Sequence, residues 1–214
     1  MANPIVWKNV QVSMQSAISA SKTITGITQA NPAVVTCTAH GFANGDIVYL
    51  EVQGMRQLNE KAVRVAAVTT DSFQLEGVDA TLYDAFISGT VAEVTLGTTL
   101  STATSISASG GDFDFIDTTT IHDNAKSQIP GLPSAISFSM EHIWDAADAG
   151  LLAMRAASDN QQKRVFKFQF GPGGKILYFA GYVGCTMLPG GSAQNLVTTQ
   201  SVITMNGTPS FYAS

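Results

Sequence analysis

Hydrophobic and polar residues alternate with a period of two in several stretches of the chain. Residues 10–15 have the sequence VQVSMQ, and residues 135–141 have the sequence AISFSME. This period places every second side chain on the same face of a β-strand. The pattern predicts half-buried strands, with Ile136, Phe138 and Met140 facing the core and the intervening Ser and Glu side chains facing solvent.

Between residues 23 and 95, short β-prone runs follow one another at close spacing. They are AVVTCT, DIVYLEV, AVRVAAV, SFQLEGV and SGTVAEV, and turn sequences such as HGFANGD separate them. Several short strands with such spacing are typical of a small antiparallel barrel or sandwich. We interpret residues 23–95 as a compact β module, inserted into a second β domain that comprises residues 1–22 and 96–214.

The segment after this module is rich in Ser, Thr, Gly and Pro. Gly110-Gly111 precedes the run DFDFIDTT, and a pair of glycines is a common hairpin turn. Residues 121–133 contain Pro130, Gly131 and Pro133, residues that punctuate secondary structure. The sequence therefore predicts a hairpin turn at the glycine pair and a long loop over residues 121–133.

One stretch has the period of a helix. Between Asp145 and Ala157, apolar residues recur at three- and four-residue intervals. We expect Asp145 to cap this helix with its carboxylate, and Asp148 suits the positive end of the helix dipole. Gly150 costs about 1 kcal/mol relative to Ala, so burial must hold the helix in place. The predicted fold is mainly β: a sandwich or barrel with one α-helix and one inserted β module.

The stretch FQFGPGGKILYF, residues 168–179, raises the question of a phosphate-binding loop. A Walker-type loop has a glycine, four residues and then Gly-Lys-Ser/Thr at the start of a helix. Gly174-Lys175 is present, but Gln169 stands where the first glycine belongs, and Ile176 stands where the hydroxyl residue belongs. A β-prone apolar run follows it. The stretch predicts a tight turn between two strands.

The net charge of the chain argues against some classes of binding partner. The chain has 214 residues, a net charge of −5 and only 13% charged residues, against about 25% in an average domain. Proteins that grip nucleic acid need clustered Lys and Arg, so the acidic balance argues against such a role. The acidic balance does not exclude a protein that DNA passes without being bound. We see no signal peptide or membrane segment and expect Cys37 and Cys185 to be reduced.

No pattern points to catalysis, a cofactor or a metal. The three histidines form no HExxH, no GxSxG is present, and His40 is expected to be a satisfied turn residue. Asp112, Asp114 and Asp117 lie close together, but the rest of a calcium-loop pattern is missing. We therefore expect no catalytic, cofactor-binding or metal-binding residues.

Two resemblances account for nearly the whole chain. The stretch FIDTTTIHDNAKSQIPGLPSAISFSMEHIWDAADAGLL, residues 115–152, resembles the core of the major tail tube protein of long, non-contractile-tailed (siphovirus-type) bacteriophages. The predicted hairpin and the long final strand follow it in the same order as in that family. Residues 23–95 are similar to a small β module of phage virion proteins, with His40-Gly41 and Phe73-x-Leu75-x-Gly77 among its signature elements.

The tail tube resemblance implies a structural protein and not an enzyme. It implies hexameric rings that stack into the tail tube, the conduit for DNA delivery into the bacterial host. The location would be the virion tail, assembled in the host cytoplasm. The implied partners are other copies of the chain, the tape-measure protein and double-stranded DNA in the lumen without specific binding, and other tail proteins at the tube ends.

The resemblance also implies where contacts lie. Strands would make the lateral contacts in a ring, and the N-terminal segment would help to join rings, together with a loop. The candidate loop residues are His122, Asp123, Asn124, Ala125, Lys126, Ser127 and Gln128. An acidic or neutral lumen would let DNA slide, with Glu93, Asp112 and Asp114 as candidates. The inserted module would lie outside, since it would block a narrow bore.

The alternative is another phage tail component built from the same modules. A tail terminator, a baseplate hub piece or a glycan-binding decoration would share this composition. A glycan binder usually presents exposed aromatic residues, and only 8% of this chain is aromatic. A hydrolase is disfavoured because the chain shows no triad and no metal-ligand motif.

Overall fold

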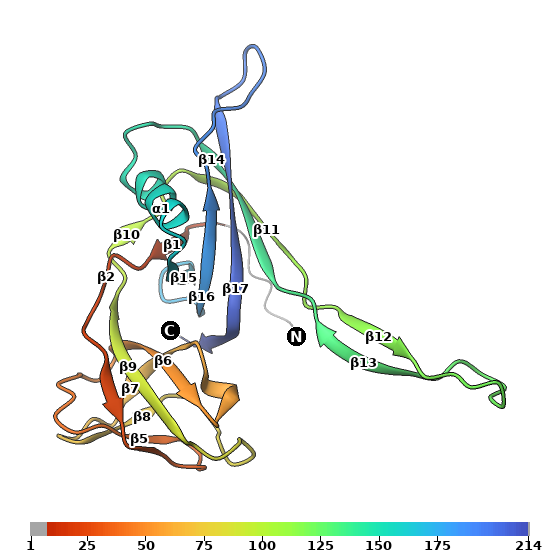
Figure 1. Cartoon of the computed structure of the whole chain (residues 1–214). Helices are drawn as coiled ribbons and strands as arrows, with labels where there is room; N and C mark the ends of the chain where they lie inside the picture. Colours follow the sequence, from red (N-terminus) through yellow and green to blue (C-terminus); the bar gives the residue numbers. More distant parts are fainter. Residues whose placement is uncertain (1–7, 214) are drawn as a thin grey trace.

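The computed structural model describes residues 8–213 and is mainly β, as the sequence predicts (Figure 1). Within the described residues there are three antiparallel sheets and a single α-helix. One of the sheets has seven strands in the order β10-β1-β15-β16-β17-β14-β11. These strands are β1 (Val10–Met14), β10 (Thr98–Thr99), β11 (Ala103–Ser109), β14 (Ser137–Ile143), β15 (Lys163–Phe170), β16 (Ile176–Cys185) and β17 (Thr198–Tyr212).

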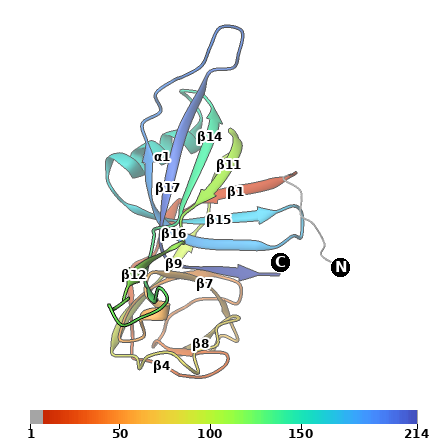
Figure 2. The ribbon, with the colours of Figure 1, turned by 90° about the vertical axis from the view of Figure 1, so that its right-hand side faces the viewer.

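The seven-stranded sheet bends sharply, so that β1 and β15 run at a steep angle to β11 and β14 (Figure 2). The long strands β16 and β17 cross the bend, and their pairing shifts register between Tyr178 and Ala180. A Cβ atom on Gly181 would lie 2.6 Å from the carbonyl oxygen of Thr204, and Gly207 has a φ of +69°. Glycine is required at both points because any side chain would clash or be strained there.

The helix α1 (Ala149–Asp159) packs on the concave side of this bent sheet, around Met140, Phe166 and Phe179. Its N-cap is Asp148, whose carboxylate accepts a hydrogen bond of 2.8 Å from the backbone N–H of Leu151. The prediction that Asp145 caps the helix is therefore wrong. Asp145 closes the preceding turn instead, accepting from the N–H of Ala147 at 2.8 Å.

The position of the helix start has a physical cause in Gly150. A Cβ atom there would lie 2.8 Å from the carbonyl oxygen of Thr99, so the first turn rests directly on the backbone of β10. This close approach is possible only for glycine, and it fixes where the helix begins. The low helix propensity of Gly150 is offset by its burial, as the sequence predicts.

A second, eight-stranded sheet curls around its own apolar core (Figure 2). Its order is β2-β9-β6-β7-β8-β5-β4, and β3 pairs with β9. These strands are β2 (Ala17–Ile18), β3 (Lys22–Ile24), β4 (Gly26–Ile27), β5 (Val34–Thr36), β6 (Ile47–Gln53), β7 (Lys61–Ala66), β8 (Ser72–Leu75) and β9 (Ser88–Thr95), with a 3-10 turn η1 (Arg56–Leu58) before β7. His40 is buried in it, with Nδ1 accepting from the N–H of Phe42 at 3.0 Å, which confirms the satisfied turn histidine.

The core of the curled sheet also includes residues of the seven-stranded sheet, among them Val165, Tyr178 and Tyr212. The Tyr212 hydroxyl accepts a hydrogen bond of 2.8 Å from the backbone N–H of Arg64. The two sheets therefore meet in this core, while a separate apolar cluster that includes Phe166 and Phe179 lies between the seven-stranded sheet and α1. The division into residues 23–95 and the remainder stays a prediction, because a shared core does not draw a boundary.

The predicted hairpin at residues 168–179 is confirmed. Strands β15 and β16 pair antiparallel from Lys163 opposite Tyr182 to Gln169 opposite Ile176, and the turn between them has positive φ angles at Gly171 and Gly173. The run after Lys175 is strand and not helix, so no helix N-terminus is present to hold a phosphate. Cys37 and Cys185 are both free and buried, as expected.

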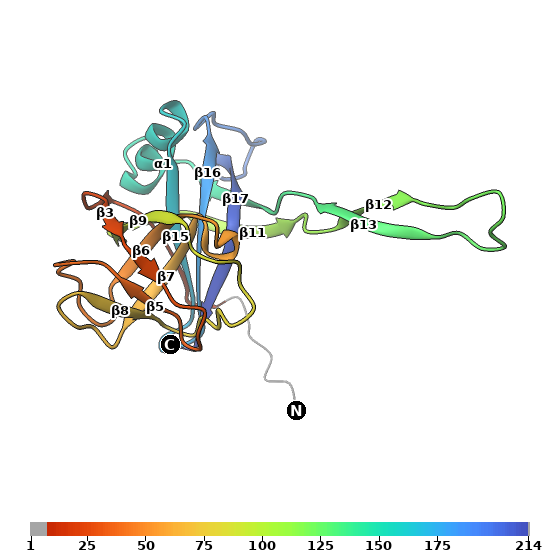
Figure 3. The same cartoon turned by 60° about the horizontal axis from the view of Figure 1, so that its bottom comes forward.

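The third sheet is a two-stranded ribbon that projects away from the rest of the molecule (Figures 1 and 3). It consists of β12 (Phe113–Asp117) and β13 (Gln128–Pro133). The prediction of a hairpin turn at Gly110-Gly111 is therefore wrong. The predicted loop over residues 121–133 is confirmed for residues 121–127 and wrong for residues 128–133, which form β13. The glycine pair joins β11 to β12, and a Cβ atom on Gly110 would lie 2.1 Å from the carbonyl oxygen of Ala135. The glycines thus let one long hairpin bend out of the core sheet.

Candidate assembly surfaces

The projecting ribbon exposes nearly all of its apolar side chains. We call residues 112–134, which include β12, β13 and the turn between them, the arm. No other element of the described chain covers it (Figure 3). Its exposed apolar side chains, each at least half exposed, are Phe113, Phe115, Ile116, Ile121, Ile129 and Leu132. An uncovered apolar patch of this kind marks an interaction surface.

The strand register divides these side chains between the two faces of the arm. Phe115 is paired with Pro130, and Ile116 is paired with Ile129. Successive residues of a strand point to opposite faces, so Phe115 and Ile116 lie on opposite faces. The pairing shifts register between Phe113 and Phe115, so that Phe113 is paired with Pro133. Both faces of the arm therefore carry exposed apolar side chains, and the same alternation places Asp114 on the face of Ile116 and Asp117 on the face of Phe115.

The turn at the end of the arm contains most of the predicted ring-to-ring loop. Its backbone is organised by short polar contacts: the Asp123 carboxylate accepts from the N–H of Thr120 at 2.7 Å, which lowers the pKa of Asp123. Six of the predicted residues lie in this exposed turn, namely His122, Asp123, Asn124, Ala125, Lys126 and Ser127. Gln128 is the first residue of β13, paired with Asp117. The N-terminal segment before residue 8, the other predicted contact, lies outside the described residues.

Both edges of the seven-stranded sheet remain open. The two-residue strand β10 pairs with only Ser13 and Met14 of β1, and β11 pairs only with β14. Residues of both edges line one hollow of about 630 Å³, including Val10, Val12 and Ile106. No strand in the described part of the chain fills it. Open strand edges carry unpaired N–H and C=O groups that another strand can join.

The predicted acidic residues do not come together. Glu93 lies in β9 of the curled sheet, opposite Val48, whereas Asp112 and Asp114 are exposed on the arm. Figure 1 shows β9 and β12 in different parts of the molecule. The structure therefore groups Asp112 with Asp114 but not with Glu93.

A different surface of the seven-stranded sheet carries few charges. Strands β11, β14, β16 and β17 contain no Lys or Arg. The strand pairing forms solvent-facing rows across the sheet: one row is Ser107, Ser139 and Val202, and the next is Ser105, Glu141 and Gln200. Small polar side chains, Val202 and one carboxylate thus make up these rows. The sequence predicts the outward positions of Ser139 and Glu141 but not their neighbours, which come from distant segments.

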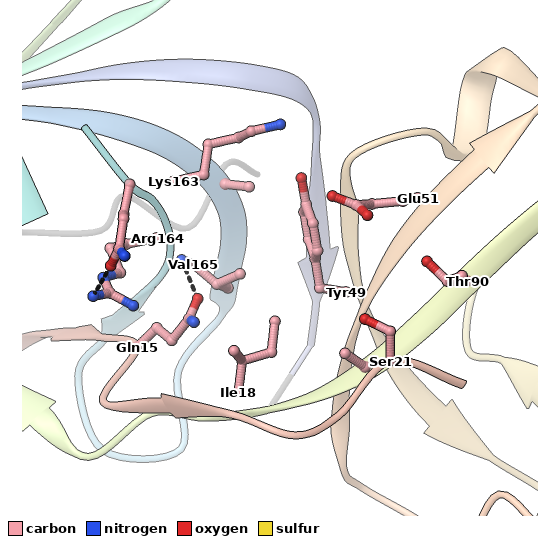
Figure 4. Close-up of a pocket in the computed structure, with 12 residues that line it drawn as sticks. Gln15, Ile18, Ser21, Tyr49, Glu51, Thr90, Lys163, Arg164 and Val165 are labelled. Carbon is pink, nitrogen blue, oxygen red and sulfur yellow. Dashed lines mark hydrogen bonds between the residues drawn. The ribbon is translucent and has the colours of Figure 1, made fainter. Parts of the chain in front are cut away.

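A cleft of about 320 Å³ separates the curled sheet from β15 (Figure 4). Tyr49, Glu51, Lys163 and Arg164 are among its lining residues. The Lys163 Nζ donates to Glu60 at 2.5 Å, so its charge is satisfied by a carboxylate. Burial raises the pKa of Tyr49 to about 12, so its phenol stays protonated and is no general base at neutral pH. The cleft is a concave surface, and its lining residues do not pair a nucleophile with a general base.

Within residues 8–213 no three His, Cys, Asp or Glu side chains are placed to hold a metal ion. No helix of the described chain reaches the length and apolarity required to cross a membrane.

One comparison with known families gives a match. The model of the family described as phage tail tube protein, TTP, matches residues 53–214. The matched region starts at the last residue of β6 and contains the arm, α1 and all of the seven-stranded sheet except β1. A search of curated proteins finds no match to the chain.

Proposed function

This chain belongs to the phage tail tube protein family, and on that premise we propose that six copies close into a ring and that rings stack into the tail tube. Proteins of this family are structural components of the virion tail, assemble with themselves and are not enzymes. The tube would be the conduit for DNA delivery into the bacterial host. The observation that carries the proposal is the uncovered apolar arm next to open sheet edges.

Lateral contacts in the ring would join sheets. A ring of identical subunits in head-to-tail arrangement brings one surface of each subunit against a different surface of the next. The open edge at β11 and the open edge at β1 and β10 are such a pair of surfaces. Joining them around the ring would satisfy the backbone groups of both edges and leave no free edge.

Ring-to-ring contacts would come from the arm. Its turn, with the six residues from His122 to Ser127, extends furthest from the core sheet (Figure 3). Gln128 would contribute from the start of β13. Replacing Ala125 with Glu would place a buried charge in this contact, and Gln128→Pro would disturb the first pair of the ribbon. Both variants are expected to fold and to form shorter tubes, and tubes of normal length would contradict the role of the turn.

The lumen would be lined by groups that do not hold DNA. Duplex DNA carries one negative charge per ~1.7 Å, and basic contacts would bind it and release counterions. The Lys- and Arg-free face of β11, β14 and β17 suits such a wall, with Glu141 as its charged group. Asp112, Asp114 and Glu93 remain candidates. A lumen dominated by Lys8, Lys163, Arg164 or Lys167 would contradict this assignment.

The other partners follow from the same arrangement. The tape-measure protein and double-stranded DNA would occupy the lumen without specific binding, and other tail proteins would cap the tube ends. The inserted module of residues 23–95 would lie on the outside of the tube. Assembly would take place in the host cytoplasm.

Negative-stain electron microscopy of the purified chain tests the proposal. Six-fold rings or hollow tubes are the expected result. Isolated monomers or trimers under all assembly conditions would overturn it and favour the alternative, a tail terminator, a baseplate hub piece or a glycan-binding decoration. A glycan array then separates the decoration from the other two.

A further inference from the structure

Both faces of the arm carry exposed apolar side chains, and a single partner surface cannot cover both faces. Phe115 is 62% exposed on one face, and Ile116 and Ile129 are 56% and 51% exposed on the other. A two-stranded ribbon has no interior of its own, and such hairpins need a further layer for stability in water. Each face of the arm therefore needs its own cover.

The edges of the arm are poorly suited to pairing with another strand. Pro130 and Pro133 lie in β13 and lack the N–H groups that a neighbouring strand would require. Asp112 and Asp114 place charges along β12. Proline and charge are common devices that prevent edge pairing. Contact through the two faces is then the mode of docking that remains.

The position of the arm indicates what covers it. β12 continues directly from β11, the open edge of the seven-stranded sheet, so the arm extends the surface that would meet the next subunit in a ring. The chain belongs to a family that assembles with itself, which makes other copies of the chain the natural cover.

We propose that each arm lies between two other copies of this chain, one on the face of Phe115 and one on the face of Ile116 and Ile129. This inference rests on the proposed self-assembly and goes beyond it, because it makes every arm a junction of three subunits. One of the two contacts would lie within a ring and the other between rings. Ring closure and ring stacking would then be coupled, since one rigid ribbon takes part in both.

Photo-crosslinking in doped tubes tests the junction. Chains carrying benzoylphenylalanine in place of Phe115, of Ile129 or of both are mixed as a small minority with unlabelled chains and assembled. Each single label is expected to give covalent pairs of chains, and the double label is expected to give sets of three. Because labelled chains are rare, a set of three requires two different neighbours.

Two results would overturn the inference while tubes still form. The first is a double label that never exceeds pairs, which would place one neighbour on both faces or leave one face bare. The second is a label at Ile129 that forms no crosslink between chains. If unlabelled chains form neither rings nor tubes, the proposed function itself fails, and this outcome is visible before any crosslink is made.

Serine variants give an independent measurement. Phe115→Ser and Ile129→Ser are each expected to reduce tube yield at least tenfold, because each removes one of the two covered faces. Leu82, 93% exposed in the curled-sheet region, provides the matched control, since Leu82→Ser removes an exposed apolar side chain far from the arm. Normal tube yield from either arm variant would contradict the three-subunit junction.

Discussion

The curled sheet and the arm are both made of antiparallel strands joined by short turns. The curled sheet buries its apolar side chains, whereas the arm exposes them. In the curled sheet, Phe73 and Leu50 are completely buried within a core of their own chain. In the arm, Phe115 and Leu132 are 62% and 85% exposed. The difference teaches that one region buries its apolar side chains within the chain, whereas the other leaves them exposed, which is the basis of the proposed contacts with other copies.

The largest effect on the stability of the single chain is expected in the curled sheet. Phe73 is fully buried and contacts His40 and Phe42 edge-on, with ring centroids 5.1 Å and 5.5 Å apart. Phe73→Ala should lower the free energy of unfolding by about 3–5 kcal/mol, from lost transfer energy and a cavity. Urea unfolding of the unassembled chain measures this. A loss below about 1 kcal/mol would mean that the curled sheet has no tightly packed core.

A smaller effect is expected where the curled sheet meets β17. Tyr212→Phe removes the hydrogen bond that its hydroxyl accepts from the backbone of Arg64, while the ring can keep its contact with the Arg64 guanidinium, 4.6 Å from the ring centroid. The expected loss is about 1 kcal/mol. Phe211→Leu, at a neighbouring position that is 73% exposed, is the control and should leave the unfolding curve unchanged. Equal losses of unfolding free energy in both variants would argue against a specific contact between the Tyr212 hydroxyl and the curled sheet.

The contact of Glu60 with Lys163, which also joins the curled sheet to the seven-stranded sheet, should contribute stability that depends on pH. Glu60 is partly buried, which raises its pKa, but hydrogen bonds from Lys163 and Asn206 and the charge of Lys163 outweigh this, so the pKa of Glu60 is lowered. A carboxyl group with a lowered folded-state pKa contributes stability that is present above its unfolded pKa and is lost as the pH falls through the folded value. Stability should therefore fall below about pH 4.5.

Thermal melts of the wild type and Glu60→Gln at a series of pH values check this contribution. The variant should be less stable at neutral pH and lose less stability on acidification. Parallel melting curves for the two proteins across the series would show that Glu60 does not anchor the two regions.

The smallest effect on the single chain is expected in the arm. Phe115→Ser removes an exposed side chain with no covering element, so the free energy of unfolding should change by no more than about 0.5 kcal/mol. The same variant should fail to assemble. Calorimetry of the unassembled chain and microscopy of the assembled sample, done on one preparation, give both answers. A marked loss of stability would show that the arm is part of the monomer core. The contrast between the buried curled sheet and the exposed arm would then not hold.

The sequence predicts the elements that depend on local periodicity. The strands of the curled sheet, the hairpin at residues 168–179 and the helix all appear, since each carries its own hydrophobic pattern. The helix start was misplaced because Asp145 and Asp148 are equally good caps in sequence, and only the contact of Gly150 with the backbone of Thr99 decides between them.

The arm and the Lys- and Arg-free face of β11, β14 and β17 lie beyond such local patterns. Pro130 and Pro133 indicate a loop, because prolines are excluded from central strands, but a two-stranded ribbon consists only of edges and tolerates them. The row formed by Ser107, Ser139 and Val202 depends on pairing between segments far apart in the chain. No period in the sequence contains that information. Glu141 was recognised as outward-facing, but its neighbours across the sheet were not.

The most direct test of the central claim is a cryo-electron microscopy reconstruction of the assembled chain that resolves the arm. The account predicts a six-fold tube in which Phe115 and Ile129 are buried against two different neighbouring copies. A tube whose arms project freely into solvent, with both side chains as exposed as in the single chain, would contradict it.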